Sequence, residues 1–467
     1  MKTLLLITAF VASTAASAWT QASEAPVTDG QRGDSNQSED SAPASPTTPW
    51  LPVAINGETG GLRFLSEGVT NLLSGGLTFG SSYDDNAYSD NSRRVGNVSY
   101  IVSPNLAIQE IRPRTMLTFN YSPGFTANQR LSQRYDYAHN LDFNLQYRIT
   151  EHLTARLKND FVKQTTAFDR INNNAGTAPL TPLQQQNDSI ITPLADRMAN
   201  LSSLDLIYAI SNSTLVGTTG SFNFLQYRNA TSGSRVHLSD SQSVGGDAFA
   251  QHRLAGNNWL GVTYSYRKIA TSGQITEGSK IHSIQLFYTF APSSHTTLSL
   301  FVGPEHIMTS DQFDIVLLIF VIPVTERKEN WNVAGGATFG WQGRRNSLQA
   351  KFIRQTSDGG GLTGAVRTSS GSFSVRRQLT SRMSGDVGFA YGANDAIGPA
   401  FNTSISSISA LAGWQHSLGD NFSIGFSYAR DHQNIRGAAN SALPPSLADH
   451  NRFWASVSYH FARPLGR

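Results

Sequence analysis

Long segments of this chain alternate between apolar and polar residues with a period of two. From residue 135 to 149 the odd positions are aromatic or aliphatic except for His139, and the even positions are polar or small. Successive side chains of a β-strand point to opposite faces, so this pattern predicts a strand with one apolar face and one wet face. The same alternation recurs in residues 117–125, 331–341 and 453–461.

These segments are longer than the strands of most soluble sheets. Soluble strands have about 5–6 residues, whereas a strand that crosses a bilayer obliquely needs about 9–11. A soluble sandwich would use shorter strands, and a propeller would show a blade repeat, which we do not find. Charged residues make up only 15% of the chain, against about 25% in soluble domains. The pattern and the composition together favour a transmembrane β-barrel.

The connections between the expected strands alternate in length. Tight turns on one side and long loops on the other are typical of barrels in the outer membrane. Counting hairpins predicts an all-β fold, a transmembrane antiparallel barrel of about 18 strands that occupies residues 75–467. The short links lie near residues 112–114, 150–152, 211–213, 256–258, 293–295, 344–346, 380–381 and 417–420, and the longer ones include 84–93, 169–195, 229–239, 309–328 and 434–448.

The N-terminus has the features of a secretory signal peptide. A short basic start is followed by an apolar stretch and by Ala16-Ser17-Ala18, which has the form of a cleavage site. We therefore assign residues 1–18 to a signal peptide. Residues 19–50 are rich in Ser, Pro, Thr and acidic residues, which predicts a disordered periplasmic leader. Residues 51–74 form an N-terminal extension that could serve as a short plug or linker.

Two segments carry a resemblance to a known family. The last strand, from Phe453 to Phe461, resembles the C-terminal assembly signal of Gram-negative outer-membrane β-barrels. Leu77-Thr78-Phe79-Gly80 and the following Tyr83-Asp84-Asp85-Asn86 are similar to the first strand and loop of β-barrel porins. Some of those porins accompany exopolysaccharide export. The resemblance implies a location in the outer membrane and a role in transport.

A barrel of about 18 strands is wide enough for an aqueous channel unless loops fold into it. The alternation predicts which charged residues face the lumen, and both signs are present among them. Rings of such charges bias the passage of ions or anionic solutes; the alternative is that they pair with one another and fill the lumen. The candidates are Asp136, Asp142, Arg148, Arg156, Lys158, Asp160, Arg267, Lys351, Asp386 and Asp431.

The run from Ile315 to Val324 is apolar and does not alternate. It lies in the expected external loop 309–328 and is too short to span a membrane as a helix. It could narrow the pore, dip into the outer leaflet or meet a partner. It could also extend two strands above the membrane, because a continuous apolar run is consistent with a strand.

Enzymatic and metal-binding readings find little support in the sequence. The chain has no Cys, which excludes a thiol catalyst and a cysteine-ligated metal. His237-Leu238-Ser239 has the spacing of a barrel phospholipase but lies beside a loop. Acidic residues and histidines at the rim would meet only through barrel closure, and an acidic loop could hold Ca²⁺. We expect no enzyme, no cofactor and no metal. The rim residues are Asp84, Asp85, Asn86, Asp90, Asn91, Asp431, His432, Asp449 and His450.

The sequence therefore predicts a porin-like channel that passes polar or anionic solutes, or a secreted polysaccharide, through a polar lumen. The alternative is a non-conducting surface barrel for adhesion or structure, with a rim hydrolase as a third reading. The expected partners are outer-membrane lipid and lipopolysaccharide, the barrel-assembly machinery, and the solute or polymer. Nucleic acid is not expected, because the Arg residues form no dense cluster.

Overall fold

A computed structural model describes residues 71–132, 134–164, 196–228, 238–272, 276–293, 295–317, 320–358, 360–362, 364–397, 404–436 and 446–465. In these ranges there is no helix with the length and hydropathy of a membrane span. The predicted signal peptide and leader lie outside the described residues, as do residues 51–70 of the extension.

The regular elements of the described ranges are strands. Their bounds are β1 (Leu72–Asp84), β2 (Asn97–Ile111), β3 (Thr115–Asn128), β4 (Tyr135–Arg148), β5 (Leu153–Gln164), β6 (Asp196–Ser211), β7 (Thr214–Arg228), β8 (Asp240–Ala255), β9 (Asn258–Ser272), β10 (Thr276–Ser293), β11 (Thr296–Leu317), β12 (Phe320–Gln342), β13 (Asn346–Ser357), β14 (Val366–Gln378), β15 (Met383–Ala396), β16 (Ser404–Ser417), β17 (Phe422–Arg436) and β18 (Ser446–Pro464).

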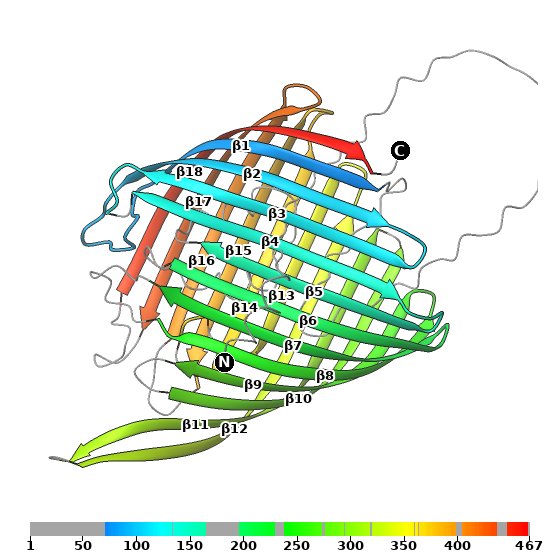
Figure 1. The fold of residues 1–467 in the computed structure, drawn as a ribbon, viewed down its shortest axis with the longest axis vertical. Coiled ribbons are helices and arrows are strands. Elements are labelled where there is room, and N and C mark those ends of the chain that lie inside the picture. Colours follow the sequence, from blue (N-terminus) through cyan, green and yellow to red (C-terminus); the bar gives the residue numbers. More distant parts are fainter. Residues whose placement is uncertain are drawn as a thin grey trace, which may run out of the picture.

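The sheet closes on itself. In the described part of the chain, 18 strands pair with their sequence neighbours, and the last strand returns to the first (Figure 1). At this seam β1 runs antiparallel to β18, from Leu72 opposite Pro464 to Asp84 opposite Arg452. Closure gives the described strands of the barrel wall a partner on both sides, which is what a β-structure needs to satisfy its backbone groups in lipid. The predicted antiparallel barrel of about 18 strands is confirmed.

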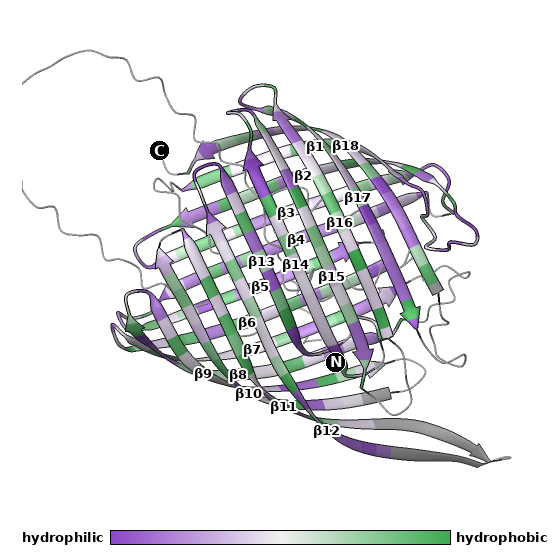
Figure 2. Ribbon diagram, turned by 180° about the vertical axis from the view of Figure 1, so that it is seen from behind, coloured by the Kyte–Doolittle hydropathy of each residue, from purple (hydrophilic) through white to green (hydrophobic). Residues whose placement is uncertain are grey.

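The two faces of the wall differ as the alternation predicts. Large apolar side chains are exposed on the outside, as at Phe79 (54%) and Trp331 (72%). Positions of opposite parity are polar and buried, such as Thr118 (4%) and Asn120 (3%). Figure 2 shows the resulting alternation of hydrophobic and hydrophilic residues along the strands. An apolar outer wall on a closed antiparallel barrel is the architecture of proteins that span the outer membrane.

The turns at one end of the barrel are tight. Arg112 and Thr115 exchange both backbone hydrogen bonds, at 2.8 and 3.2 Å, so that β2 and β3 are joined by a short hairpin. Short turns of this kind mark the periplasmic end, and the longer connections mark the extracellular end.

One expected loop is instead a pair of strands. We predicted an external loop at residues 309–328, and this was wrong. β11 and β12 run through it in continuous register, from Thr296 opposite Trp341 to Leu317 opposite Phe320. Figure 1 shows this hairpin extending well past the other strands. The apolar run from Ile315 to Val324 therefore belongs to a strand extension, one of the readings that the sequence left open.

Candidate functional site

The connection between β13 and β14 folds into the barrel. Connections at the extracellular end normally lie on the surface because their backbone needs water. Here every described residue of the segment 358–365 is buried, including Asp358 (5% exposed), Leu362 (5%) and Ala365 (0%). We refer to residues 358–365 as the inner loop. The inner loop was not predicted from the sequence, where its visible signal is a run of glycines that follows Asp358.

Hydrogen bonds tie the inner loop to the wall several strands away. Asp358 accepts bonds from Asn223 Nδ2 at 3.0 Å and from Ser241 Oγ at 3.2 Å. The hydroxyl of Tyr227 donates to the carbonyl of Gly360 at 2.5 Å. Because these partners lie on the inward faces of β7 and β8, while the loop starts from β13, the segment crosses part of the lumen.

Two further bonds fix the middle and the far end of the inner loop. The backbone N–H of Ser239 donates to the carbonyl of Gly361 at 2.8 Å, and the N–H of Gly364 donates to Thr271 Oγ1 at 3.2 Å. Gly361 has a φ of +117°, a conformation that side chains disfavour. The loop therefore has a defined path along β8 and β9.

Apolar side chains pack around the inner loop. Leu362 and Val366 contact Ile405, Ile435 and Leu238. Ala365 packs in a second cluster, whose other members are Ile269, Ile281, Ile307 and Ile397. These isoleucines take inward positions near the extracellular end, so the lumen here is less polar than the sequence suggested. Apolar constrictions can control the passage of water and ions.

The strand registers place the ten predicted lumen residues opposite in parity to the exposed aromatic side chains. Asp142 stands directly across from Asp160 and accepts a bond from Asn120 Nδ2 at 2.9 Å. Asp136 accepts a bond from Asn128 Nδ2 at 2.7 Å. They lie on the inward face, and their role in lining a channel stays a prediction. The full set is Asp136, Asp142, Arg148, Arg156, Lys158, Asp160, Arg267, Lys351, Asp386 and Asp431.

The ion pairs of this set join neighbouring strands. Arg156 NH2 lies 2.6 Å from Asp205 Oδ2, between β5 and β6. Arg452 pairs with Asp431 between β18 and β17, and Ser409 Oγ donates to the same carboxylate at 2.5 Å. Asp205 and Arg452 were not among our candidates, because a single sequence does not reveal the register that brings them to Arg156 and Asp431. These pairs lie along the wall and do not cross the lumen.

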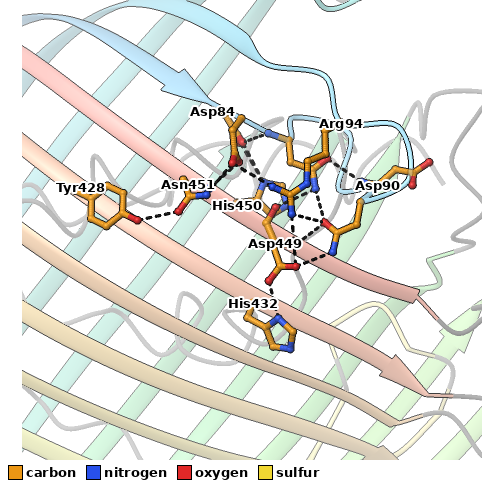
Figure 3. Close-up of polar contacts among 11 residues, drawn as sticks. Asp84, Asp90, Arg94, Tyr428, His432, Asp449, His450 and Asn451 are labelled. Carbon is orange, nitrogen blue, oxygen red and sulfur yellow. Dashed lines mark hydrogen bonds and ion pairs between the residues drawn. The ribbon is translucent and has the colours of Figure 1, made fainter.

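Barrel closure brings the acidic first loop against the last strand, as the rim reading required (Figure 3). Asp85 receives two bonds from Asn451, at 2.8 Å from the backbone N–H and at 2.7 Å from Nδ2. On β18, which also contains Asn451, Asp449 lies 2.8 Å from His432 Nδ1 and 3.6 Å from Arg94. We refer to residues 85–96 as the first loop. Hydrogen bonds and an ion pair join it to β18.

Two other sequence readings concern the acidic loop and the His237-Leu238-Ser239 triplet. Within the described ranges, no three His, Asp or Glu side chains are grouped as metal ligands would be. The carboxylate of Asp90 instead accepts bonds from the hydroxyl and backbone N–H of Ser92, which lower its pKa. Of the His237-Leu238-Ser239 triplet, His237 lies outside the described residues, and the backbone of Ser239 serves the inner loop.

No family model matches the chain, and no curated protein matches it in sequence. Solved structures with a similar fold include the outer membrane protein OpdK from Pseudomonas aeruginosa, at 9% identity and a TM-score of 0.38, covering 84% of this chain and 99% of that one. A BenF-like porin from Pseudomonas fluorescens has 8% identity and a TM-score of 0.38, covering 83% and 99%. The ferric-catecholate import receptor Fiu from E. coli has 8% identity and a TM-score of 0.41, covering 84% and 82%. None of these likenesses assigns a function to this chain.

Proposed function

We propose that this protein is an outer-membrane channel for small polar solutes, and that the inner loop forms its constriction. The observation that carries the proposal is the burial of the described residues of the inner loop, which Asn223, Tyr227 and Ser241 hold against β7 and β8. A loop that narrows the lumen near one mouth selects solutes by size. The charged wall below it selects them by charge.

The same loop favours small solutes over a polysaccharide. A polymer needs a bore that stays open along its length, whereas Leu362 and Val366 pack firmly against Ile405 and Ile435. We therefore place passage of a secreted polymer second. It would require the inner loop to leave these contacts.

The experiment is a comparison of single-channel conductance in planar bilayers. Ser357 and Val366 are directly paired across β13 and β14. Replacing residues 358–365 by Asn-Gly, which favours a two-residue hairpin turn, therefore removes the inner loop and keeps the register. The proposal predicts a severalfold rise in conductance over the wild type. An unchanged conductance in the folded variant would contradict a constriction at this place.

We also propose that the outer wall contacts phosphorylated lipid headgroups, such as those of lipopolysaccharide. Lys268 and Lys280 stand directly opposite each other on β9 and β10, and both are exposed on the outer face. Like charges in this position repel unless an anion lies between them. Changing both to Gln should weaken co-purification of lipopolysaccharide, while the outward Arg354→Gln should not. The barrel-assembly machinery remains an expected partner during insertion.

A further inference from the structure

Ser89, His450 and Asp84 form a hydrogen-bonded series at the seam between β1 and β18. His450 Nε2 lies 3.1 Å from Ser89 Oγ, and His450 Nδ1 lies 3.1 and 3.3 Å from the two carboxylate oxygens of Asp84. Figure 3 shows Asp84 and His450 facing each other across the seam. An imidazole between a serine hydroxyl and a carboxylate can take the serine's proton while the carboxylate fixes the ring.

The acid and the base are both held in place. Asp84 is 3% exposed and His450 is 2% exposed. Asp84 Oδ1 also accepts a bond from the backbone N–H of Asn86 at 2.8 Å. Because an ionised carboxylate only accepts hydrogen bonds, Nδ1 of the ring must be the donor. The Nε2 atom of a neutral ring is then an acceptor for the Ser89 hydroxyl.

The backbone of Ser89 is strained. Its φ is +56°, and among the described residues no other non-glycine residue has a positive φ. Asn86 holds this turn, since its carbonyl accepts the N–H of Ser89 at 2.9 Å and its Oδ1 accepts the N–H of Asp90 at 3.0 Å. Strained residues fixed by their surroundings cluster at active sites, and nucleophilic serines often sit on sharp turns.

The first loop is fixed to β18 on both sides of this turn. Asn86 Nδ2 donates to the carbonyl of Asp449 at 2.9 Å, and Asn91 Nδ2 donates to the Asp449 carboxylate at 2.7 Å. Together with the two bonds between Asp85 and Asn451, these contacts set the distance between Ser89 and His450. Nucleophile and base are therefore pre-positioned, which is the condition for efficient proton transfer.

We propose that Ser89 is the nucleophile of a serine esterase site at the extracellular mouth, with His450 as general base and Asp84 as its orienting carboxylate. Ser89 Oγ attacks the ester carbonyl carbon as its proton passes to His450 Nε2. The ester C–O bond then breaks, and the leaving alkoxide takes that proton and departs as the alcohol. Water attacks the acyl-serine and gives a proton to His450. The carboxylic acid leaves as the proton returns to Ser89 Oγ.

The charges around the site are mixed. Asp85 and Asp449 lie 3.4 and 3.6 Å from Arg94, and Asp90 accepts hydrogen bonds from Ser92 that keep its pKa low. Because these carboxylates have partners, charge does not set the class of ester. Ser89 is only partly exposed, so the substrates are carboxylic esters with small groups around the carbonyl carbon.

The test uses the folded full-length protein in detergent and a fluorophosphonate probe, which phosphonylates activated serines. The proposal predicts covalent labelling that peptide mass mapping places on Ser89 of the wild type. Ser89→Ala should abolish labelling, and His450→Gln should slow it at least about 100-fold. Ser92→Ala is the matched control, because the Ser92 hydroxyl bonds to Asp90 and to no histidine in the described contacts; it should label like the wild type.

Mapping the label on the wild type does not depend on any variant folding. A wild type that stays unlabelled at Ser89, or equal labelling of Ser89→Ala, would overturn the proposal and leave the series as a structural link between the first loop and β18. Hydrolysis of p-nitrophenyl acetate with a burst of p-nitrophenol would further support an acyl-serine.

Discussion

At the scale of single residues, some charged side chains of the lumen form ion pairs between neighbouring strands. Arg156 and Arg452 are paired with carboxylates on neighbouring strands, at Asp205 and Asp431. Within each pair, the two opposite charges largely cancel each other's electric field. Arg267 on β9 also lies on the inward face, four residues before Thr271, which bonds to the inner loop.

We predict that Arg267→Gln shifts ion selectivity toward cations, because the variant removes a positive charge from the inward face. Reversal potentials under a salt gradient measure this shift. Lys268→Gln is a matched control, since Lys268 is the next residue in the chain and is exposed on the outer face. Equal reversal potentials for the wild type and Arg267→Gln would argue against a lumen lined by this residue.

Gly80 lies in close contact with β18 at the seam between β1 and β18. A Cβ at Gly80 would lie 2.2 Å from ring atoms of Trp454, which is 7% exposed. We predict that Gly80→Val lowers the free energy of unfolding by about 1–3 kcal/mol, because overpacking forces the ring or the strand to move. Urea titration in detergent measures it. At Gly220, where a Cβ would meet no atom within 4 Å, the same change should cost far less; similar losses at both sites would refute this explanation.

The sequence could show which face each charged residue occupies, but not its partner. The period of two is a local property, so Asp136 and Lys158 could be assigned to one face from their neighbours alone. The partner of a charged residue depends on strand register, which a single sequence does not reveal. The pairing of Asp205 with Arg156 was therefore not predicted. The series of Ser89, His450 and Asp84 was only partly predictable. Barrel closure suggested that Asp84 and His450 meet. Ser89 reaches His450 through a turn with a positive φ, which the local sequence does not reveal.

At the scale of elements, the inner loop could not be predicted for a related reason. Its inward path is decided by contacts with Asn223, Ser241 and Thr271, which lie far away in the chain. The β11–β12 extension was expected as a loop because its apolar run does not alternate, and a strand extension was one of the readings left open. Strands whose pattern repeats with a period of two were predicted, and segments that depend on distant contacts were not.

We predict that loosening the anchors of the inner loop makes the channel noisy. The double variant Tyr227→Phe with Asn223→Ala removes the hydrogen bond to Gly360 and one of the two bonds to Asp358, while keeping β7. Open-channel current should then fluctuate between levels that the wild type does not show. Phe222→Leu, an outward change on the same strand, serves as the control. Steady current in the double variant would mean that the loop needs neither bond.

We predict that the β11–β12 extension is dispensable for conduction. Beyond the pairing of Gln312 with Thr276, the described residues of β11 pair only with β12. Removing residues 313–324 should leave folding and single-channel conductance unchanged. Heat-modifiable mobility on gels and bilayer recordings check this. Loss of conductance in a folded variant would show that the extension contributes to the pore.

At the scale of the whole molecule, the main features of the structure follow from closure of the barrel. It forms an apolar outer wall, encloses a lumen, and brings the first loop beside the last strand. Strand length and the alternation of short and long connections predicted this architecture from sequence, because both are requirements of crossing a bilayer. What the lumen admits is decided by the inner loop and by the charges below it.

The most direct test of a water-filled lumen is the single-channel conductance of the refolded wild-type protein in a planar bilayer. We predict stable open steps, with an ion selectivity that changes when Arg267 is replaced. A correctly folded barrel that inserts and yet stays silent would contradict it. That result would mean that the inner loop closes the lumen, and would favour a non-conducting barrel that acts through its extracellular surface.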